Sequence, residues 1–378
     1  MVSLAQAQEA EAPAEEASPS VNLSLFADTY VSYNSSKSGT AGPYHRAFDN
    51  LTPFDPVTAF PTTAGATPDD AIPAAFGMRN GFGLSMVGLD ANFDTGTVGA
   101  TAFLRFGPTV PIYYAQDMGV AGLDSMLGGF VTIKPTEALT LDAGYFGTIY
   151  GAEVAESWIN FNYTRGALYY AMQPFYHFGL KGAYAVNDMV TVRAMVVNGV
   201  NNIADENDAP ALGLQLALAG IGDVFDLSLG AFYETGDDSS WGIETFFDVI
   251  ATLHLGDLTV LANFDYNIDR AAVDGADDTS NYGLAGTLAY AATPEVGVAV
   301  RGEYLADPDD AIWNLEPPGD EMNLITATGT LDLRLLPHLI LRPEFRYEMS
   351  SRDIFTDGDG GATDNWFTAV LGLVATTQ

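Results

Sequence analysis

The chain has 378 residues, and its 49 Asp and Glu residues outnumber its 14 Lys and Arg residues, which gives a formal net charge of −35. This balance excludes nucleic-acid binding, because a phosphate backbone needs a basic surface. Hydrophobic residues make up 48% of the chain, which excludes wholesale disorder, and the absence of Cys excludes disulfides and thiolate sites. No apolar run reaches the ~18 residues of a membrane-spanning helix, so a helical membrane protein is excluded as well.

The first 20 residues are predicted to lie outside the folded domain. Residues 1–7 read MVSLAQA, and the closing AQA fits the small-x-small cleavage site of a signal peptide, of which this would be a remnant. An ordinary start with a chance match to that pattern is the alternative. Residues 8–20 are rich in Ala, Glu and Pro and hold four acids and no base, so we expect them to be disordered. Residues 21–378 are predicted to form the folded domain.

Beyond this segment, polar and apolar residues alternate with a period of two, which indicates strands with one apolar and one polar face. In the clearest stretch, Leu331, Leu333 and Leu335 alternate with Asp332 and Arg334. The same pattern predicts sixteen strands, at residues 21–34, 81–94, 97–107, 126–134, 138–148, 176–187, 189–200, 211–219, 225–235, 241–255, 258–269, 281–293, 296–306, 323–336, 339–350 and 366–377.

The connections between these strands alternate in length. Tight turns, such as Pro337-His338, alternate with mostly long connections, at residues 35–80, 108–125, 149–175, 201–210, 236–240, 270–280, 307–322 and 351–365. An even number of strands with short turns at one end and long loops at the other is typical of a transmembrane β-barrel. The sequence therefore predicts an all-β, antiparallel up-and-down barrel, with both termini and the short turns in the periplasm and the long loops outside the cell.

A water-soluble β-sandwich would show the same alternation of polar and apolar residues. The aromatic residues favour the barrel, because those on the apolar face gather near the two strand ends. Tyr33, Tyr145 and Tyr304 are examples at the long-loop end, and Tyr184 lies near the short turns. Amphipathic rings form such girdles at the two interfaces of a membrane, whereas a sandwich core has no reason to sort rings by strand end.

Sixteen strands enclose a lumen too wide for side chains to fill, so we expect an aqueous channel unless a loop plugs it. The polar strand face carries thirteen acids and eight bases, and the long loops carry 26 acids and six bases. The residues predicted to line the pore or its constriction are Arg105, Asp142, Glu153, Glu156, Arg165, Lys181, Arg193, Glu244, Asp248, Asp265, Arg301, Glu303, Asp332, Arg334, Arg342, Glu344 and Arg346.

The connection at residues 149–175 is predicted to fold into the lumen and narrow it. It is rich in Tyr, Trp and Asn, and an aromatic loop needs a surface on which to pack. We expect its acids Glu153 and Glu156 to face Arg165 and wall bases such as Lys181 and Arg193, which would set up a transverse field. The alternative is a loop that packs outward over the rim of the barrel.

One region carries a family resemblance. The segments GAEVAES at 151–157, NFNYTRG at 160–166, PFYHFG at 174–179 and VVNGVNN at 196–202 follow one another in an order that resembles the OmpL-like porins of bacterial outer membranes. The final hairpin, LRPEFRYEMSS, is similar to theirs. This resemblance implies an outer-membrane diffusion channel for small hydrophilic solutes, surrounded by lipids and lipopolysaccharide, and it leaves the oligomeric state open.

The excess of acids predicts a preference for cations, because many charges of one sign around a common axis add up. Two other functions stay open: a surface anchor or adhesin whose barrel is plugged by loops, and an outer-membrane lipase. The sequence has no G-x-S-x-G motif, no pair of His at a metal-ligand spacing and no cofactor motif, so we expect no enzyme and no cofactor.

An acidic stretch near the C-terminus resembles half of a calcium-binding loop. Residues 357–361 read DGDGG, but the downstream bidentate Glu of an EF-hand is missing. A flexible acidic loop is therefore the favoured interpretation, and weak Ca²⁺ binding at Asp357 and Asp359 is the alternative.

Overall fold

The fold is that of a computed structural model, which describes residues 19–35, 81–107, 109–110, 125–205, 208–235, 243–269, 278–310, 312, 321–359 and 361–377. The predicted signal-peptide remnant and nearly all of the acidic segment at residues 8–20 lie outside these ranges, as does most of the first long connection.

The described chain consists of strands and one short helix. In chain order the elements are β1 (Ser20–Asn34), β2 (Gly81–Asp94), β3 (Val98–Phe106), β4 (Ser125–Thr136), β5 (Leu139–Gly147), α4 (Ala167–Met172), β6 (Tyr176–Ala185), β7 (Val190–Val197), β8 (Ala211–Ile221), β9 (Phe225–Glu234), β10 (Thr245–Leu255), β11 (Leu258–Asp269), β12 (Thr279–Thr293), β13 (Val296–Asp307), β14 (Met322–Leu336), β15 (Leu339–Ser350), β16 (Phe355–Thr356), β17 (Ala362–Thr363) and β18 (Asn365–Thr376). No helix among the described residues has the length and apolar character needed to span a membrane.

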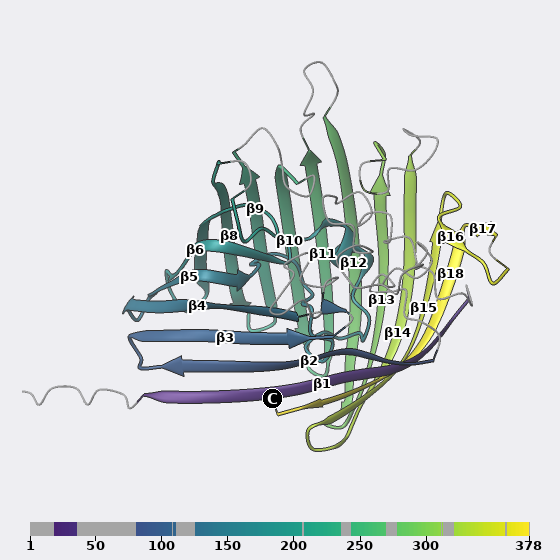
Figure 1. Ribbon diagram of the computed structural model, residues 1–378, viewed down its shortest axis with the longest axis horizontal. Coiled ribbons are helices and arrows are strands. Elements are labelled where there is room, and N and C mark those ends of the chain that lie inside the picture. Colours follow the sequence, from purple (N-terminus) through teal and green to yellow (C-terminus); the bar gives the residue numbers. More distant parts are fainter. Residues whose placement is uncertain are drawn as a thin grey trace, which may run out of the picture.

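Sixteen of these strands form one closed antiparallel barrel, in which each strand pairs with its neighbours in the chain (Figure 1). The barrel closes where β1 pairs with β18, with Phe26 opposite Thr376 and Val31 opposite Leu371. Closure satisfies the backbone hydrogen bonds of both edge strands, which a strand in lipid requires. The start of β1 lies beside the end of β2, with Ser20 opposite Asp94, so both chain ends of the barrel lie at its short-turn end.

The structure confirms the predicted sixteen-strand barrel. Each predicted strand corresponds to one barrel strand, although β10 begins at Thr245, four residues later than predicted. The last predicted loop contains an additional feature, the two-stranded pair of β16 and β17, in which Asp357 N donates to Gly361 O at 2.7 Å. Each of these two strands has only two residues, which is too short for alternation of polar and apolar residues to be recognised in the sequence.

The aromatic girdle is present at most of its described positions, since Tyr33, Tyr304 and Tyr184 are exposed on the outer face. Tyr145 is the exception, because it is buried, and its ring lies 5.5 Å from that of Phe103 and 4.7 Å from that of Tyr176. The preceding residue, Gly144, has a φ of 133°, which breaks the regular alternation of the strand. The predicted position of Tyr145 on the lipid face is therefore wrong.

Candidate channel constriction

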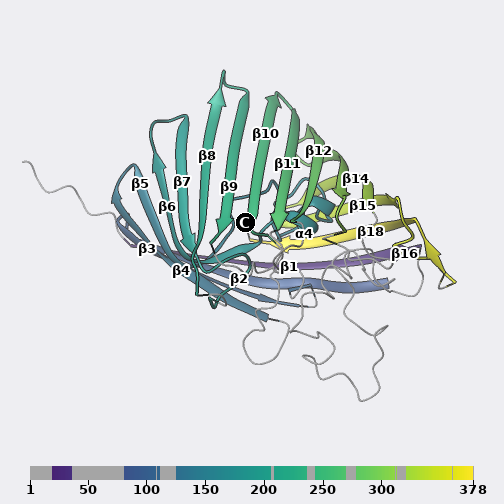
Figure 2. The ribbon, with the colours of Figure 1, turned by 90° about the horizontal axis from the view of Figure 1, so that it is seen from above.

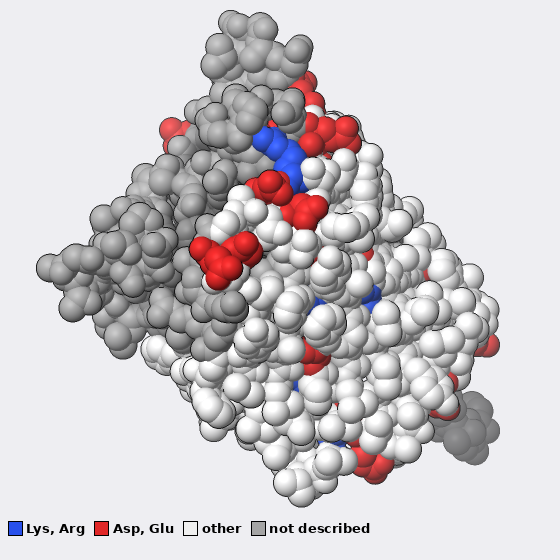
Figure 3. Space-filling view, turned by 90° about the vertical axis from the view of Figure 1, so that its right-hand side faces the viewer, with Lys and Arg blue, Asp and Glu red and all other residues white. Residues whose placement is uncertain are grey.

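Every charged side chain on the described barrel strands belongs to the lumenal face. The register shows this directly, because the inward residues Asp142 and Lys181 lie opposite each other, as do Glu303 and Thr326. Leu and Val side chains, such as Leu214, occupy the outer face. The side of the wall seen in Figure 3 correspondingly carries few charged residues over most of its area. An apolar outer face and a charged inner face are what a barrel in lipid requires.

The connection between β5 and β6 lies inside the barrel. We call residues 148–175 the inner loop; its two ends are joined by a hydrogen bond from Thr148 N to Phe175 O at 3.1 Å. The loop contains α4, which Figure 2 shows within the ring of strands. Aromatic rings hold the loop together, since Tyr169 stacks on Phe175 with 4.9 Å between their centroids. The predicted inward folding of this connection agrees with these contacts and with those described below.

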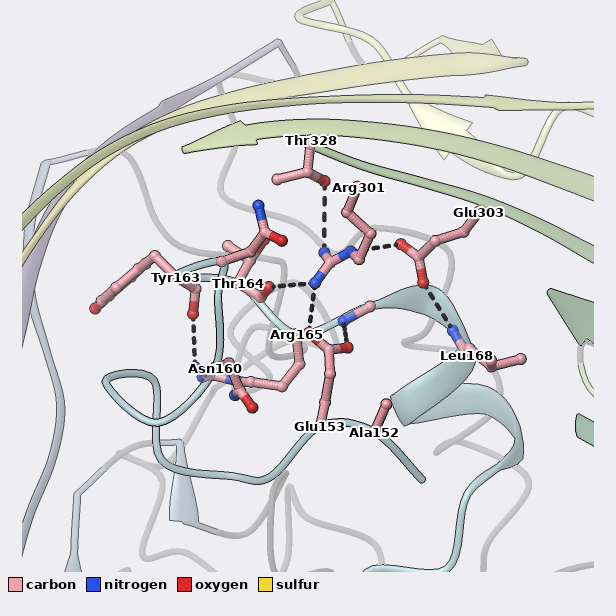
Figure 4. A network of polar contacts seen from close by, with 12 residues as sticks. Ala152, Glu153, Asn160, Tyr163, Thr164, Arg165, Leu168, Arg301, Glu303 and Thr328 are labelled. Atoms are coloured by element: carbon pink, nitrogen blue, oxygen red, sulfur yellow. Dashed lines mark hydrogen bonds and ion pairs between the residues drawn. The ribbon is translucent and has the colours of Figure 1, made fainter. Parts of the chain in front are cut away.

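The first part of the inner loop is fixed to β13 by an ion pair and by hydrogen bonds (Figure 4). Arg301 Nη1 lies 2.5 Å from Glu153 Oε1 of the loop, and Arg301 Nε lies 3.1 Å from Glu303 Oε2 of its own strand. The loop backbone takes part as well, because Gly166 N donates to Glu153 Oε2 at 2.6 Å and Leu168 N donates to Glu303 Oε1 at 3.2 Å. Charge-assisted hydrogen bonds of this kind are stronger than neutral ones, so they hold the loop firmly against the wall.

Glu153 differs electrostatically from an exposed glutamate. Burial raises the pKa of Glu153 above its ordinary value, and the nearby Glu303 carboxylate adds to this effect. The guanidinium of Arg301 acts in the opposite direction, since it favours the ionised form of Glu153. The charge of this loop residue therefore depends on its pairing with Arg301.

The tip of the inner loop reaches the opposite side of the barrel, at β1 and β15. Ser157 Oγ donates to Asp28 Oδ2 at 2.7 Å, and Arg342 donates through Nη1 to the Ser157 carbonyl. The ring of Trp158 packs on Phe26 with 4.1 Å between the centroids. Polar and aromatic contacts together attach the tip to β1 and β15.

The middle of the loop binds a single carboxylate of β15. Glu344 accepts hydrogen bonds from Tyr163 N at 2.6 Å, from Thr164 N at 3.0 Å and from Thr164 Oγ1 at 2.5 Å. Tyr163 also donates its phenol to Asp28 Oδ1 at 2.7 Å, and burial raises the pKa of Tyr163, so the phenol stays protonated. Its ring lies against Gly372 of β18, where a Cβ atom would come within 2.3 Å of it.

The end of the loop contacts the acidic sector of the wall at β10 and β11. Gln173 Nε2 donates to Asn263 Oδ1 at 2.8 Å and to Asp265 Oδ2 at 3.0 Å. Asn263 Nδ2 in turn donates to Asp248 and Asp265, at 2.9 Å each. Asp248 and Asp265 are directly opposite across the two strands, so the Asn263 amide bonds to both members of a buried carboxylate pair.

The structure corrects the predicted ion-pair partners of the loop. Glu153 pairs with Arg301, and Glu156 Oε1 lies 2.9 Å from Arg105 Nη2. Lys181 pairs instead with Asp142 at 3.4 Å, and Arg193 donates to Gln215 at 2.6 Å. Lys181 and Arg193 contact residues on neighbouring strands. The loop acids Glu153 and Glu156 pair with bases on β13 and β3.

The guanidinium of Arg165 bonds to the backbone of the inner loop itself. Arg165 Nη1 donates to the Tyr163 carbonyl at 2.6 Å, so its guanidinium closes a turn of the loop. Its own carbonyl accepts from Arg346 Nη1 at 2.9 Å. Arg165 therefore contributes to the shape of the inner loop and to its attachment on β15.

Many of the predicted pore-lining residues are covered by protein. The following ten residues are buried: Arg105, Arg165, Glu244, Asp248, Asp265, Arg301, Glu303, Arg342, Glu344 and Arg346. The wall residues among them face the lumen, but they do not line open water, because the inner loop and neighbouring side chains cover them. Asp142, Lys181, Arg193, Asp332 and Arg334 keep part of their surface accessible, as do Glu153 and Glu156. Only these seven residues are therefore accessible from the lumen among those predicted to line the pore.

Several residues of the constriction were missed by sequence reasoning, among them Ser157, Tyr163, Gln173 and Asn263. Their polar groups contact residues far away in the sequence, which a local pattern does not reveal. One usable signal was present: Gly372 interrupts the inward face of an otherwise regular strand. A strand glycine often marks a place where another group approaches closely, and here that group is Tyr163.

The remaining chemical candidates have structural roles in the described chain. His177 is buried, with Nε2 3.2 Å from Thr148 Oγ1 and Nδ1 2.9 Å from the Gly199 carbonyl. Asp357 Oδ1 accepts from the backbone N of Asp359 and of Gly361, at 2.9 and 2.8 Å. The described residues contain no group of three or more His, Asp or Glu side chains that could hold a metal ion.

The closed barrel with its apolar outer face and charged lumen defines the class of outer-membrane β-barrels. Residues 20–376 match the family described as "Putative beta-barrel porin-2, OmpL-like". The chain belongs to this family of β-barrel porins, which confirms the resemblance found in its sequence. No curated protein matches the chain.

Solved structures show the same fold at low sequence identity. A loop L8 deletion mutant of OmpT, an outer membrane protein of Vibrio cholerae, has a TM-score of 0.59 at 12% identity, with 95% of this chain and 99% of that chain covered. An anion-selective porin from Comamonas acidovorans has a TM-score of 0.57 at 11% identity, with coverage of 95% and 99%. The outer membrane channel DcaP of Acinetobacter baumannii has a TM-score of 0.55 at 13% identity, with coverage of 95% and 97%.

Proposed function

We propose that the protein is a porin of the bacterial outer membrane, a water-filled channel through which small hydrophilic solutes diffuse. The observation that carries this proposal is the lumenal placement of every charged side chain on the described strands, in a barrel too wide for side chains to fill. Family membership supports the same function. We also propose that the protein is not an enzyme, since its sequence has no G-x-S-x-G motif and the buried His177 contacts Thr148 and the Gly199 carbonyl.

The inner loop is proposed to narrow this channel. Its ion pairs place Glu153 beside β13 and Glu156 beside β3, and both carboxylates keep part of their surface accessible. On the wall, Lys181 and Arg193 carry accessible positive charge. The narrowest part of the path then presents acids on the loop and bases on β6 and β7. These opposite charges set up a transverse field, although the loop acids pair with Arg301 and Arg105 and not with Lys181 and Arg193.

A preference for cations is the second part of the proposal. The chain carries a net charge of −35, and most of this charge belongs to the long connections at one end of the barrel. These charges attract cations toward that mouth, and salt screens them over about 8 Å at physiological ionic strength. With both chain ends at the short-turn end of the barrel, we propose that this end faces the periplasm and that the acidic loops face outward.

One observation favours a second candidate function, a barrel that serves as a surface anchor. The inner loop packs against β15, where Arg346 donates to the Arg165 carbonyl at 2.9 Å, and both Arg346 and Glu348 are almost completely buried. A loop packed this closely could close the lumen instead of narrowing it. The anchor and the porin then differ in a single property, the passage of solutes.

Liposome swelling measures that property directly. Liposomes that contain the purified protein are diluted into isotonic solutions of neutral sugars of increasing size, and the change in turbidity is followed. The porin predicts rapid swelling with the smallest sugars and slower swelling as their size increases. Absence of swelling with every sugar, from a protein that migrates on gels as a folded barrel, would contradict the porin and support the anchor.

A further inference from the structure

We propose that the lumen contains a binding site for a small monocarboxylate with an apolar body, which goes beyond passive diffusion and rests on the proposed channel. The site is a cavity of about 250 Å³. It lies between the tip of the inner loop and the short-turn ends of strands β11 to β14. It lies near the short-turn end of the barrel, because the turn residues Asp257 and Glu295 form part of its edge. We call this cavity the tip pocket.

Apolar surface in the tip pocket comes from two residues of the loop. Ile159 and Phe161 line the cavity with 59% and 41% of their surface exposed, although the surrounding lumen is polar. The facing wall consists of small residues, including Ala289, Gly297 and Ala299, and so leaves room beside them. Exposed apolar side chains that line a cavity favour a ligand with an apolar body.

The tip is held in place before any ligand arrives. Trp158 packs on Phe26, and Ile159 N donates to Glu156 O at 3.3 Å. Asn160 closes the turn by two hydrogen bonds with Val154, at 2.9 Å to its N and 2.7 Å to its O. A preformed pocket does not have to order its own side chains on binding, which increases affinity.

The positive charge at the floor of the tip pocket selects the ligand's polar group. Asp332 lies between two guanidinium groups, with Arg342 Nη2 at 2.5 Å and Arg334 Nε at 3.1 Å. One carboxylate neutralises only one of the two, and Arg342 is buried whereas the Arg334 side chain is 48% exposed. Arg334 is therefore the group that would bind an incoming carboxylate.

The rim of the tip pocket limits the charge of the ligand. Asp257 and Glu295 lie at its edge, and their carboxylates repel any negative charge of the ligand that is not in direct contact with Arg334. Together the floor and the rim favour a monoanion over a dianion. Ile159 and Phe161 favour one that has an aromatic or branched apolar body, such as benzoate.

The test uses 4-fluorobenzoate and ¹⁹F NMR with the full-length protein in detergent micelles. Binding is read from the probe's line width, and 4-fluorobenzyl alcohol and 4-fluorobenzylammonium serve as uncharged and cationic comparators. We expect the carboxylate to bind most tightly. Ile159→Ser combined with Phe161→Ser should weaken its binding at least about five-fold, because most of the buried apolar surface is lost. The variant Arg334→Gln should remove the preference for the carboxylate over the alcohol.

Val154→Ser is the matched control, because Val154 is an equally exposed apolar residue of the same loop, at 41%, and does not line the tip pocket. It should bind the probe as the wild-type protein does. The proposal is overturned if the double variant and the control bind equally, or if the cationic probe binds best. Sugar-driven swelling of liposomes is measured separately for each variant, so a channel without this site is distinguished from a protein that forms no channel.

Discussion

Glu153 and Arg301 are separated by 148 positions in the chain, yet their side chains meet at 2.5 Å within the barrel. This contact joins the inner loop, between β5 and β6, to β13 on a distant part of the wall. The loop thereby becomes part of the lumen wall over much of its length. Its attachment sites, rather than the barrel strands alone, determine the shape of the proposed channel.

The two members of this ion pair are expected to respond differently to mutation. Arg301→Gln leaves Glu153 and Glu303 close together in a buried site without their main counter-charge, which should cost roughly 3–5 kcal/mol. Glu153→Gln keeps an acceptor oxygen for Arg301 but places an amide NH2 where Gly166 N needs an acceptor, and it leaves Arg301 paired with Glu303, so it should cost less than Arg301→Gln. The temperature at which the folded band disappears on a denaturing gel measures the difference. An equal fall in this temperature for both variants would contradict the predicted difference between Arg301→Gln and Glu153→Gln.

Mild acid should loosen the inner loop. Burial raises the pKa of Glu153, so on acidification it takes up a proton while an ordinary Glu, with a pKa of about 4.3, is still ionised. The ion pair with Arg301 is then lost as the pH falls through this raised value. Because the folded protein favours the protonated form, acidification does not destabilise the barrel through Glu153.

Single-channel recordings at a series of pH values test this behaviour. We expect open-channel noise to increase as the pH is lowered, with the onset above about pH 4.3. Glu153→Gln should show the increased noise already at neutral pH and lose this pH-dependent component. A Glu153→Gln variant with the same pH dependence as the wild type would assign the effect to other carboxylates.

A methyl group on Gly372 should displace the loop. A Cβ atom there would lie 2.3 Å from the ring of Tyr163, which is too close for both to keep their places. Gly372→Ala should therefore change the single-channel conductance and lower the unfolding temperature. Gly329→Ala on β14 is the control, because a Cβ atom at Gly329 meets nothing within 4 Å. The close packing of Tyr163 would be refuted by two variants that behave alike.

The barrel could be predicted from sequence because its signals are local. Alternation along each strand places residues such as Arg301 and Leu214 on opposite faces, whatever the distant parts of the chain do. The loop partners could not be predicted in this way, because Glu344 and Asp28 reach Tyr163 only once the barrel has closed. The positive φ of Gly144 likewise accompanies a Tyr145 side chain that lies in the interior and not in the predicted girdle.

Cation preference is tested by the zero-current potential across a planar bilayer under a KCl gradient. The excess of acids in the chain predicts a potential whose sign indicates preference for K⁺. The preference should fade as the ionic strength rises, because screening shortens the reach of the loop charges. A sign that indicates chloride preference at low salt would mean that Lys181, Arg193 and Arg334 control the narrowest point.

The central claim, a channel narrowed by the inner loop, is tested most directly by single-channel conductance in a planar bilayer. The wild-type protein is compared with a variant from which residues 154–161 are deleted, at the same salt concentration. We predict stable open steps for both proteins and a larger step for the deletion variant, because the tip no longer occupies the lumen. Equal step sizes would contradict the narrowing, and a wild-type protein that shows no open step at any voltage would contradict the channel itself.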